Sequence, residues 1–133
     1  MNLTIATIAK QINASFEGDA SLLIDTISID SRSLPHGPHT LFFALIGPNN
    51  DAHSYIIDLI QQGVTHFVVQ YIPEDCVGKA HFLVVQNTLA ALQELASYHR
   101  SLFQVPVIGV TGSNGKTIVK EWLNFLLSPD FNV

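Results

Sequence analysis

The sequence predicts an α/β fold, and three observations support this. Short continuous apolar runs, such as residues 41–46, are typical of strands that are covered on both faces of a sheet. These runs alternate along the chain with segments whose apolar residues recur at helical spacing. A glycine-rich loop over 111–117 separates the last apolar run from a final helical pattern. Alternation of strands and helices favours a sheet of parallel strands.

Composition and charge narrow the class of protein. Of the 133 residues, 47% are hydrophobic and 13% are charged, so the chain can bury a core. The net charge is −5 and the basic residues form no cluster, which disfavours nucleic acid or an anionic membrane as a partner. We recognise no signal peptide and no apolar run of about 20 residues, and therefore expect a cytoplasmic protein without membrane insertion. The single cysteine, Cys76, excludes an intrachain disulfide.

The first 30 residues predict a helix and a strand. Thr4 is a suitable N-cap for a helix over 5–12, where apolar residues repeat at helical spacing. The segment 15–19, which contains polar residues and a glycine, is expected to end that helix. β-branched residues alternate loosely over 22–29, which predicts a half-buried strand.

The next part of the chain predicts one strand and one helix between loops. Residues 34–40 are rich in proline and glycine and predict a turn. The buried strand over 41–46 is followed by a second loop at 47–51. A helical pattern then runs to about Gln62, and Gly63 is well placed to end it.

The third part predicts two strands and a long helix. Short apolar strands are expected at 66–70 and 81–85. The helix spans about 88–102, and Asn87 is a plausible N-cap.

The last part of the chain reads as the start of a second domain. We place the boundary near 103–105, between a domain at 1–103 and a domain that begins at residue 104. A strand is predicted at 106–110, and an amphipathic helix at 116–127 after the glycine loop. Four residues of this helix would face a central sheet that is mostly absent: Trp122, Leu123, Leu126 and Leu127. The alternatives are that the helix packs on the first domain, on another copy of the chain, or not at all.

The glycine loop has the chemistry of a phosphate-binding loop. Its glycines let the backbone curl so that N–H groups point inward, and it opens onto a helix N-terminus that favours an anion. Lys116 supplies a mobile positive charge for terminal phosphates, and Thr117 offers a hydroxyl to a magnesium ion carried by the nucleotide. The usual spacing would require glycine where the chain has Val110. The alternative is a Gly/Asn turn that happens to precede a lysine, but the predicted strand before it and helix after it favour nucleotide binding.

Two further loops carry candidate ligand-binding residues at predicted strand ends. In the first loop, Arg32 can grip a phosphate with two N–H groups, and Ser31 can add a hydroxyl hydrogen bond. The alternative is a surface turn closed by an Asp30–Arg32 ion pair. In the second loop, Asn49 and Asn50 lead a polar cluster.

For this second cluster the competing interpretation is a helix cap, in which Asn50 or Asp51 bonds to the first turn. By themselves the residues favour the cap. The six histidines, His53 among them, show no spacing typical of a metal site.

Taken together, these segments resemble the Mur ligases, the ATP-dependent amide-forming enzymes of peptidoglycan precursor synthesis. The segment 107–123, VIGVTGSNGKTIVKEWL, is similar to their ATP-binding signature, including its variant glycine spacing. The Asp-Ser-Arg turn after residue 29, the run 41–45 and the loop 47–51 resemble the domain of that family that holds the UDP end of the substrate. The stretch 85–100 is similar to the helix that connects this domain to the central one.

The resemblance implies roles for individual residues. Ser31 and Arg32 would contact the uridine diphosphate, and Asn49 and Asn50 would lie near the uracil. In such ligases ATP phosphorylates the substrate carboxylate, and an incoming amine then attacks the acyl phosphate. Lys116 would be the catalytic residue, because it neutralises charge that builds on the transferring phosphoryl group. The ATP phosphates and Mg²⁺, the latter through Thr117, would be held by Gly112, Ser113, Asn114, Gly115, Lys116 and Thr117.

Within the family, the loop sequence is closest to the members that add D-alanyl-D-alanine to UDP-N-acetylmuramoyl-tripeptide. Ile118 and Ala52 replace a common threonine and glycine, as in ligases that are fused to an alanine racemase. The alternatives are another Mur ligase, such as the tripeptide-forming enzyme, and a non-catalytic nucleotide-binding module. A folate-polyglutamate-type ligase shares the glycine loop. It lacks the uridine-binding domain with the Asp-Ser-Arg turn that residues 22–53 resemble, so these residues disfavour it.

The same resemblance implies that the sequence is an N-terminal part of such a ligase. Domain 1–103 would bind the UDP-bearing substrate, and 104–133 would begin a truncated ATP-binding central domain. The acidic magnesium ligand, a modified lysine and a closing C-terminal domain would lie beyond Val133. The chain by itself is therefore expected to lack ligase activity.

Overall fold

A computed structural model describes residues 2–32 and 37–133. The chain divides into two compact units, residues 1–103 and 104–133, which are described separately. Residues 34–36 of the turn predicted at 34–40 lie outside the described residues.

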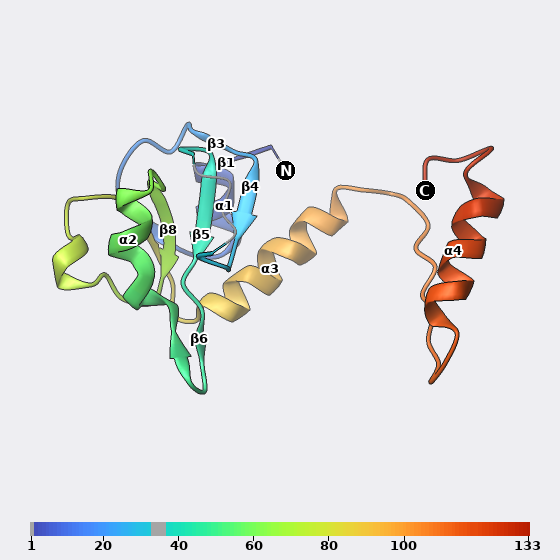
Figure 1. Ribbon diagram of the computed structural model, residues 1–133. Helices are drawn as coiled ribbons and strands as arrows, with labels where there is room; N and C mark the ends of the chain where they lie inside the picture. Colours follow the sequence, from blue (N-terminus) through green and yellow to red (C-terminus); the bar gives the residue numbers. More distant parts are fainter. Residues whose placement is uncertain (1, 33–36) are drawn as a thin grey trace. The chain divides into compact units, whose positions relative to one another are not determined.

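The first unit is built on a five-stranded, mainly parallel sheet (Figure 1). Four parallel strands lie side by side, β4 (Thr26–Ser28), β5 (Thr40–Phe43), β8 (His66–Val69) and β9 (His81–Val84). A short strand, β2 (Ser15–Phe16), pairs antiparallel with β9 at the edge. The predicted α/β class with parallel strands is confirmed.

Helices cover both faces of this sheet. The helices α1 (Ile5–Gln11) and α3 (Thr88–Ser101) pack on one face, and α2 (Ile56–Gln61) packs on the other. Neighbouring residues of β5 alternate between the faces, because successive side chains of a strand point in opposite directions. All four residues of β5 are buried, as predicted for the first part of the run 41–46. The strand ends at Phe43, however, and Ile46 is exposed in another strand.

The core therefore consists of two apolar layers separated by the sheet. The layer beneath α1 and α3 contains Ile5, Ile8, Ile12, Ile24, Leu41, Phe43, Val68, Leu83, Val85, Ala91 and Leu95. The layer beneath α2 contains Phe42, Ala44, Ala52, Ile56, Leu59, Val64, Phe67, Val69, Cys76 and Phe82. Cys76 is thus a buried core residue.

The helix termini follow local signals in the sequence. The Thr4 side chain accepts a hydrogen bond from the Thr7 N–H, and the Asn87 side chain accepts one from the Ala90 N–H, so both predicted N-caps are confirmed. Gly63 follows the end of α2 with φ +94°, a conformation that glycine adopts without steric cost. The Thr88 hydroxyl donates to the Ala44 carbonyl (3.0 Å), which ties the start of α3 to the end of β5.

Two sequence predictions in the first unit were wrong in detail. The strand expected at 22–29 is broken into β3 (Leu23–Ile24), which pairs with β1 (Leu3–Thr4), and β4. The segment 15–19 contains β2 rather than only a turn. These short strands depend on partners far along the chain, which local periodicity does not reveal.

Between β5 and α2 the chain forms a small antiparallel hairpin, β6 (Ile46–Gly47) and β7 (Asn50–Asp51). A 3₁₀ turn, η1 (Ala52–Tyr55), joins the hairpin to α2. A second one, η2 (Glu74–Cys76), lies between β8 and β9.

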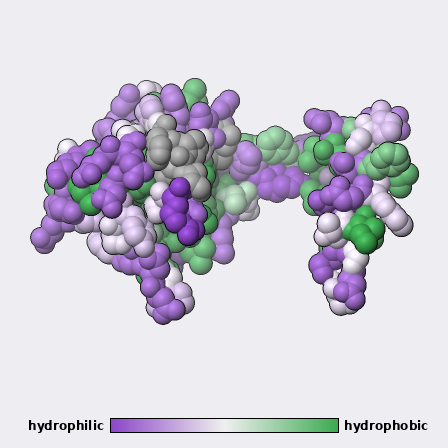
Figure 2. Space-filling view, viewed as in Figure 1, coloured by the Kyte–Doolittle hydropathy of each residue, from purple (hydrophilic) through white to green (hydrophobic). Residues whose placement is uncertain are grey.

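The second unit contains one helix, α4 (Lys116–Leu127), where the sequence predicted it. The prediction of a strand at 106–110 is wrong, because residues 103–115 contain no helix or strand. A strand needs a neighbour for its backbone hydrogen bonds, and the described part of this unit has no other strand. The sequence left open what covers the apolar face of α4, and in this structure the face is exposed. No residue of α4 is buried, and Trp122 is 67% exposed, in keeping with the hydrophobic patches on this unit in Figure 2.

Candidate functional site

The carboxyl ends of the parallel strands bring candidate residues to one edge of the sheet. The loop with Ser31 and Arg32 follows β4, and the hairpin with Asn49 and Asn50 follows the end of β5. The segment after β8 begins with Gln70 and Tyr71. In an open sheet with parallel strands, this edge is where ligands usually bind.

In the first loop, Arg32 pairs with Asp30. Its Nε and Nη2 atoms donate to the two Asp30 carboxylate oxygens, each at 3.0 Å, and its backbone N–H donates to Oδ1. These hydrogen bonds lower the pKa of Asp30 to about 2. The ion-pair turn considered for this loop is therefore formed. The Arg32 side chain is still 87% exposed, so a phosphate can reach its guanidinium group.

The hairpin is held by a buried histidine. His53 is only 2% exposed, and its Nδ1 lies 2.6 Å from Asp51 Oδ1. Its Nε2 accepts a hydrogen bond from the Gln70 backbone N–H at 3.0 Å. Because Nε2 is an acceptor, the ring is neutral and carries its proton on Nδ1, which donates to Asp51. The end of β7 is thereby linked to the end of β8.

Tyr71 closes this arrangement from the other side. Its ring stacks on His53 with centroids 4.2 Å apart and an interplanar angle of 9°, and its hydroxyl donates to Asp51 Oδ2 at 2.6 Å. Burial alone would raise the pKa of Asp51, but the hydrogen bonds from Tyr71 and His53 together lower it. The Asp51 side chain also accepts from the His53 backbone N–H, so Asp51 is the cap of η1. This confirms the capping interpretation for Asp51.

A shallow pocket of about 310 Å³ lies beside this network. Asn50 lines it, and the Asn50 Oδ1 accepts a hydrogen bond from the Tyr55 hydroxyl at 2.8 Å, which leaves the amide N–H groups available. Sequence reasoning missed Tyr71 and Tyr55; the only available signal was an aromatic residue directly after a predicted strand. The residues that line the pocket are Asn49, Asn50, Asp51, His53, Ser54, Ile57, Tyr71, Pro73, Asp75 and Cys76.

In the second unit the glycine loop turns into α4. Gly112 has φ +148° and Gly115 has φ +79°, values at which a side chain would be strained. Gly115 is the N-cap of α4, and the Lys116 ammonium group folds back to donate to the Gly112 carbonyl. The first N–H groups of the helix and the Lys116 charge therefore lie at the same loop, where an anion can bind.

Within residues 2–32 and 37–133, no three His, Cys, Asp or Glu side chains gather in a way that could hold a metal ion. The same residues include no helix that is long and apolar enough to cross a membrane.

Fold and loops together define an α/β protein whose exposed loops suit phosphate-bearing ligands. Comparison with known proteins makes this more specific. The chain is 42% identical over 112 residues to the UDP-N-acetylmuramoyl-tripeptide–D-alanyl-D-alanine ligase of Synechocystis sp., covering 83% of this chain and 24% of that protein. It is 36% identical over 108 residues to the UDP-N-acetylmuramoyl-L-alanyl-D-glutamate–2,6-diaminopimelate ligase of Bacteroides thetaiotaomicron, covering 80% and 22%.

A solved structure agrees with the sequence matches. The crystal structure of MurF from Acinetobacter baumannii superposes with a TM-score of 0.85 at 28% identity, covering 98% of this chain and 28% of that one. No family model matches the chain. The chain belongs to the Mur ligase family. It is similar to an N-terminal portion of MurF and spans about a quarter of the length of the relatives it matches.

Proposed function

We propose that this sequence supplies the UDP-binding part and the phosphate-binding loop of an ATP-dependent ligase. The ligase adds D-alanyl-D-alanine to UDP-N-acetylmuramoyl-tripeptide in peptidoglycan precursor synthesis, in the cytoplasm. The observation that carries this proposal is that both candidate loop systems lie in a chain that superposes over 98% of its length on a MurF structure.

The unit at 1–103 binds the uridine diphosphate end of the substrate. Arg32 is almost fully exposed and can turn from Asp30 to a phosphate, while Ser31 adds a hydroxyl. Asn49 and Asn50 lie near the uracil, and the free amide N–H groups of Asn50 suit a carbonyl oxygen of that base.

The unit at 104–133 holds the phosphates of ATP. The positive φ values of Gly112 and Gly115 and the start of α4 fit a phosphate group, because they bring backbone N–H groups to one loop. Ser113 and Asn114 lie in the turn between these glycines. Lys116 exchanges its contact with the Gly112 carbonyl for a phosphate oxygen and neutralises charge on the phosphoryl group.

Magnesium would reach this loop with the nucleotide. Thr117, on the first turn of α4, is the residue that offers it a hydroxyl oxygen. When bound, Mg²⁺ supplies charge stabilisation at the phosphates.

A second candidate is the tripeptide-forming Mur ligase, because a relative of that type matches 80% of the chain at 36% identity. The sequence of the glycine loop and the higher identity to the Synechocystis enzyme favour D-alanyl-D-alanine addition.

Calorimetric titration of the 133-residue chain tests the proposal. We expect affinity for UDP-N-acetylmuramoyl-tripeptide that weakens about tenfold in Arg32→Ala, because a hydrogen bond to a charged group contributes about 1.5–3 kcal/mol. Arg100→Ala, at the end of α3, is the matched control and should bind like the unchanged chain. Affinity for ATP or GTP without any for the UDP-muramoyl peptide would instead support a nucleotide-binding module.

A further inference from the structure

The network of Asp51, His53 and Tyr71 joins the hairpin that follows β5 to the segment that follows the neighbouring strand β8. Asp51 ends the hairpin that carries Asn49 and Asn50, whereas Tyr71 follows β8. Tyr71 is bonded through its hydroxyl to Asp51, is stacked on His53, and is followed by no regular element until η2. Its contacts therefore tie the hairpin to the ligand-binding edge of the sheet.

The apolar core does little to hold this hairpin. Its outer residues, Ile46, Gly47 and Asn50, are exposed, and β6 and β7 pair with each other in a sheet of two strands. An isolated two-stranded hairpin is marginally stable in water. Besides the chain at each end, two kinds of contact attach it. Within the adjoining η1, the Tyr55 and Ser54 hydroxyls donate to Asn50 Oδ1 and to the Asp51 carbonyl. The contacts that reach the segment after β8 are made by the Asp51 side chain.

The Asp51 carboxylate accepts from three donors at once. They are the Tyr71 hydroxyl at 2.6 Å, the His53 ring at 2.6 Å and the His53 backbone N–H at 3.0 Å. Hydrogen bonds that involve an ionised group are shorter and stronger than neutral ones. Because the His53 ring is also fixed by the Gln70 N–H, the carboxylate is held in one orientation.

From this geometry we infer that Tyr71 is a positioning residue for uridine recognition, acting through Asp51 on the hairpin that presents Asn49 and Asn50. This inference rests on the proposed function, which places the uracil near those two asparagines. Tyr71 has no predicted contact with the diphosphate. Its effect is to keep the asparagine amides over the pocket before the ligand arrives, which reduces the ordering cost of binding.

Two variants test the role of the hydroxyl. Tyr71→Phe keeps the ring that stacks on His53 and removes only the donor to Asp51. Tyr98→Phe, on α3, is the matched control, because its hydroxyl lies outside the network. The affinity of each 133-residue variant for UDP-N-acetylmuramoyl-tripeptide is measured by calorimetry, and its Tm by circular dichroism.

We expect Tyr71→Phe to weaken binding by up to about tenfold, because the hairpin must then be ordered when the ligand binds and the lost hydrogen bond to Asp51 limits that added cost. The Tm values show whether both variants are folded at the temperature of the titration. Equal affinities for the two variants, with the unchanged chain still binding, would overturn the positioning role and leave the proposed function intact. If the unchanged chain does not bind, the proposed function fails and the inference fails with it.

Titration of Asp51 tests whether Tyr71 acts through this carboxylate or affects ligand binding in another way. The Tyr71 hydrogen bond is the main interaction that lowers the pKa of Asp51, so its removal raises that pKa. The other groups near this carboxylate are His53 and, across the pocket, Asp75. The pKa of the Asp51 carboxyl, followed by NMR titration, should therefore be higher in Tyr71→Phe than in Tyr98→Phe. Equal values in the two variants would contradict action through Asp51.

Discussion

The hairpin of the first unit and the glycine loop of the second both offer polar groups to a ligand, but different interactions hold them. The hairpin is fixed by His53, which is 2% exposed, and by three hydrogen bonds to one carboxylate. The glycine loop is exposed throughout, and Lys116 bonds only to the loop's own carbonyl at Gly112. The first site owes its shape to tertiary contacts, and the second to local backbone conformation.

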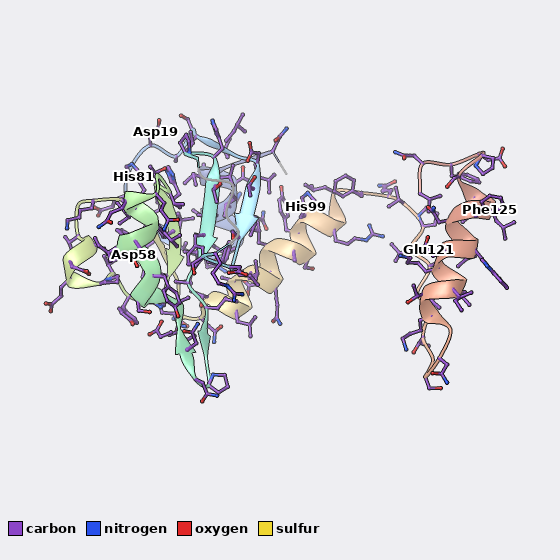
Figure 3. The ribbon with its side chains drawn as sticks, in the orientation of Figure 1. Asp19, Asp58, His81, His99, Glu121 and Phe125 are labelled. Atoms are coloured by element: carbon purple, nitrogen blue, oxygen red, sulfur yellow. The ribbon has the colours of Figure 1, made fainter. Side chains whose placement is uncertain are left out.

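The same contrast extends to the apolar residues. The first unit buries two complete layers on either side of its sheet. In the second unit, strongly hydrophobic residues such as Trp122 and Phe125 of α4 stay on the surface (Figures 2 and 3). A local motif can therefore keep its conformation where no core is present, whereas a site built from several strands cannot.

The largest expected effect compares two phenylalanines. Phe42 is fully buried, and Phe125 is 79% exposed. Phe42→Ala should lower the free energy of unfolding by about 3–5 kcal/mol, because it leaves a cavity in the core. Phe125→Ala should change it by less than about 0.5 kcal/mol. Urea unfolding followed by circular dichroism measures both, and similar losses for the two variants would show that the contrast is wrong.

The next effect concerns two lysines of α4. Lys116 bonds to the glycine loop, whereas Lys120 pairs with Glu121 on the helix surface. Lys116→Ala should weaken Mg·ATP binding by about 10- to 100-fold, because a charged hydrogen bond to phosphate is lost. Lys120→Ala should bind within about twofold of the unchanged chain. Both values come from equilibrium titration. Equal effects would mean that general charge, rather than the loop, attracts the nucleotide.

These differences explain which features of the structure could be predicted from the sequence. The caps Thr4 and Asn87 and the helix α3 were predictable, because capping and periodicity are local properties. So was the glycine loop, whose φ values depend on its own residues. The strand at 106–110 was not correctly predicted, because a strand also needs a partner.

The contacts that hold the hairpin could not be predicted from the sequence, because they too depend on partners far along the chain. Tyr71 meets Asp51 only after β8 has been placed beside β5, and no motif links the two positions. Sequence reasoning singled out Asp51 and His53 as polar residues in a loop, without the burial of His53 or its neutral state. Tertiary contacts such as these are read from a structure, not from spacing.

A third prediction tests the amino end of the sheet, away from the candidate site. His66 is buried and stacks on His81 with ring centroids 4.8 Å apart (Figure 3 labels His81 and Asp19). Burial and the neighbouring His81 lower the pKa of His66 to about 4, while Asp19 acts in the opposite direction. The unfolded chain therefore binds more protons than the folded one between about pH 6.5 and pH 4, so stability falls as the pH falls through that window.

The size of this loss is about 2 kcal/mol. His66→Gln should remove most of it, and His99→Gln, on α3, should not. Urea unfolding at pH 7 and at about pH 4.5 gives the comparison. A pH dependence that is unchanged in His66→Gln would mean that other groups bind the protons.

The smallest effect concerns the exposed pair at the other end of the sheet, which contrasts with the buried hairpin. The hydrogen bonds from Arg32 hold the pKa of Asp30 at about 2, and this carboxylate should titrate there in an NMR experiment. Arg32→Gln should return its pKa toward the usual value of about 3.9, whereas Arg100→Gln should not. The lowered pKa contributes stability above the unfolded value, which is lost between about pH 3.9 and pH 2.

The same carboxylate reports whether Arg32 takes up a phosphate. The guanidinium group cannot use both Nε and Nη2 for Asp30 and for a diphosphate at the same time. Saturation with UDP-N-acetylmuramoyl-tripeptide should therefore raise the pKa of Asp30, because the hydrogen bonds that lower it are given up. If the pKa of Asp30 in the saturated chain equals its pKa in the ligand-free chain, Arg32 remains paired with Asp30. The diphosphate would then be bound without it.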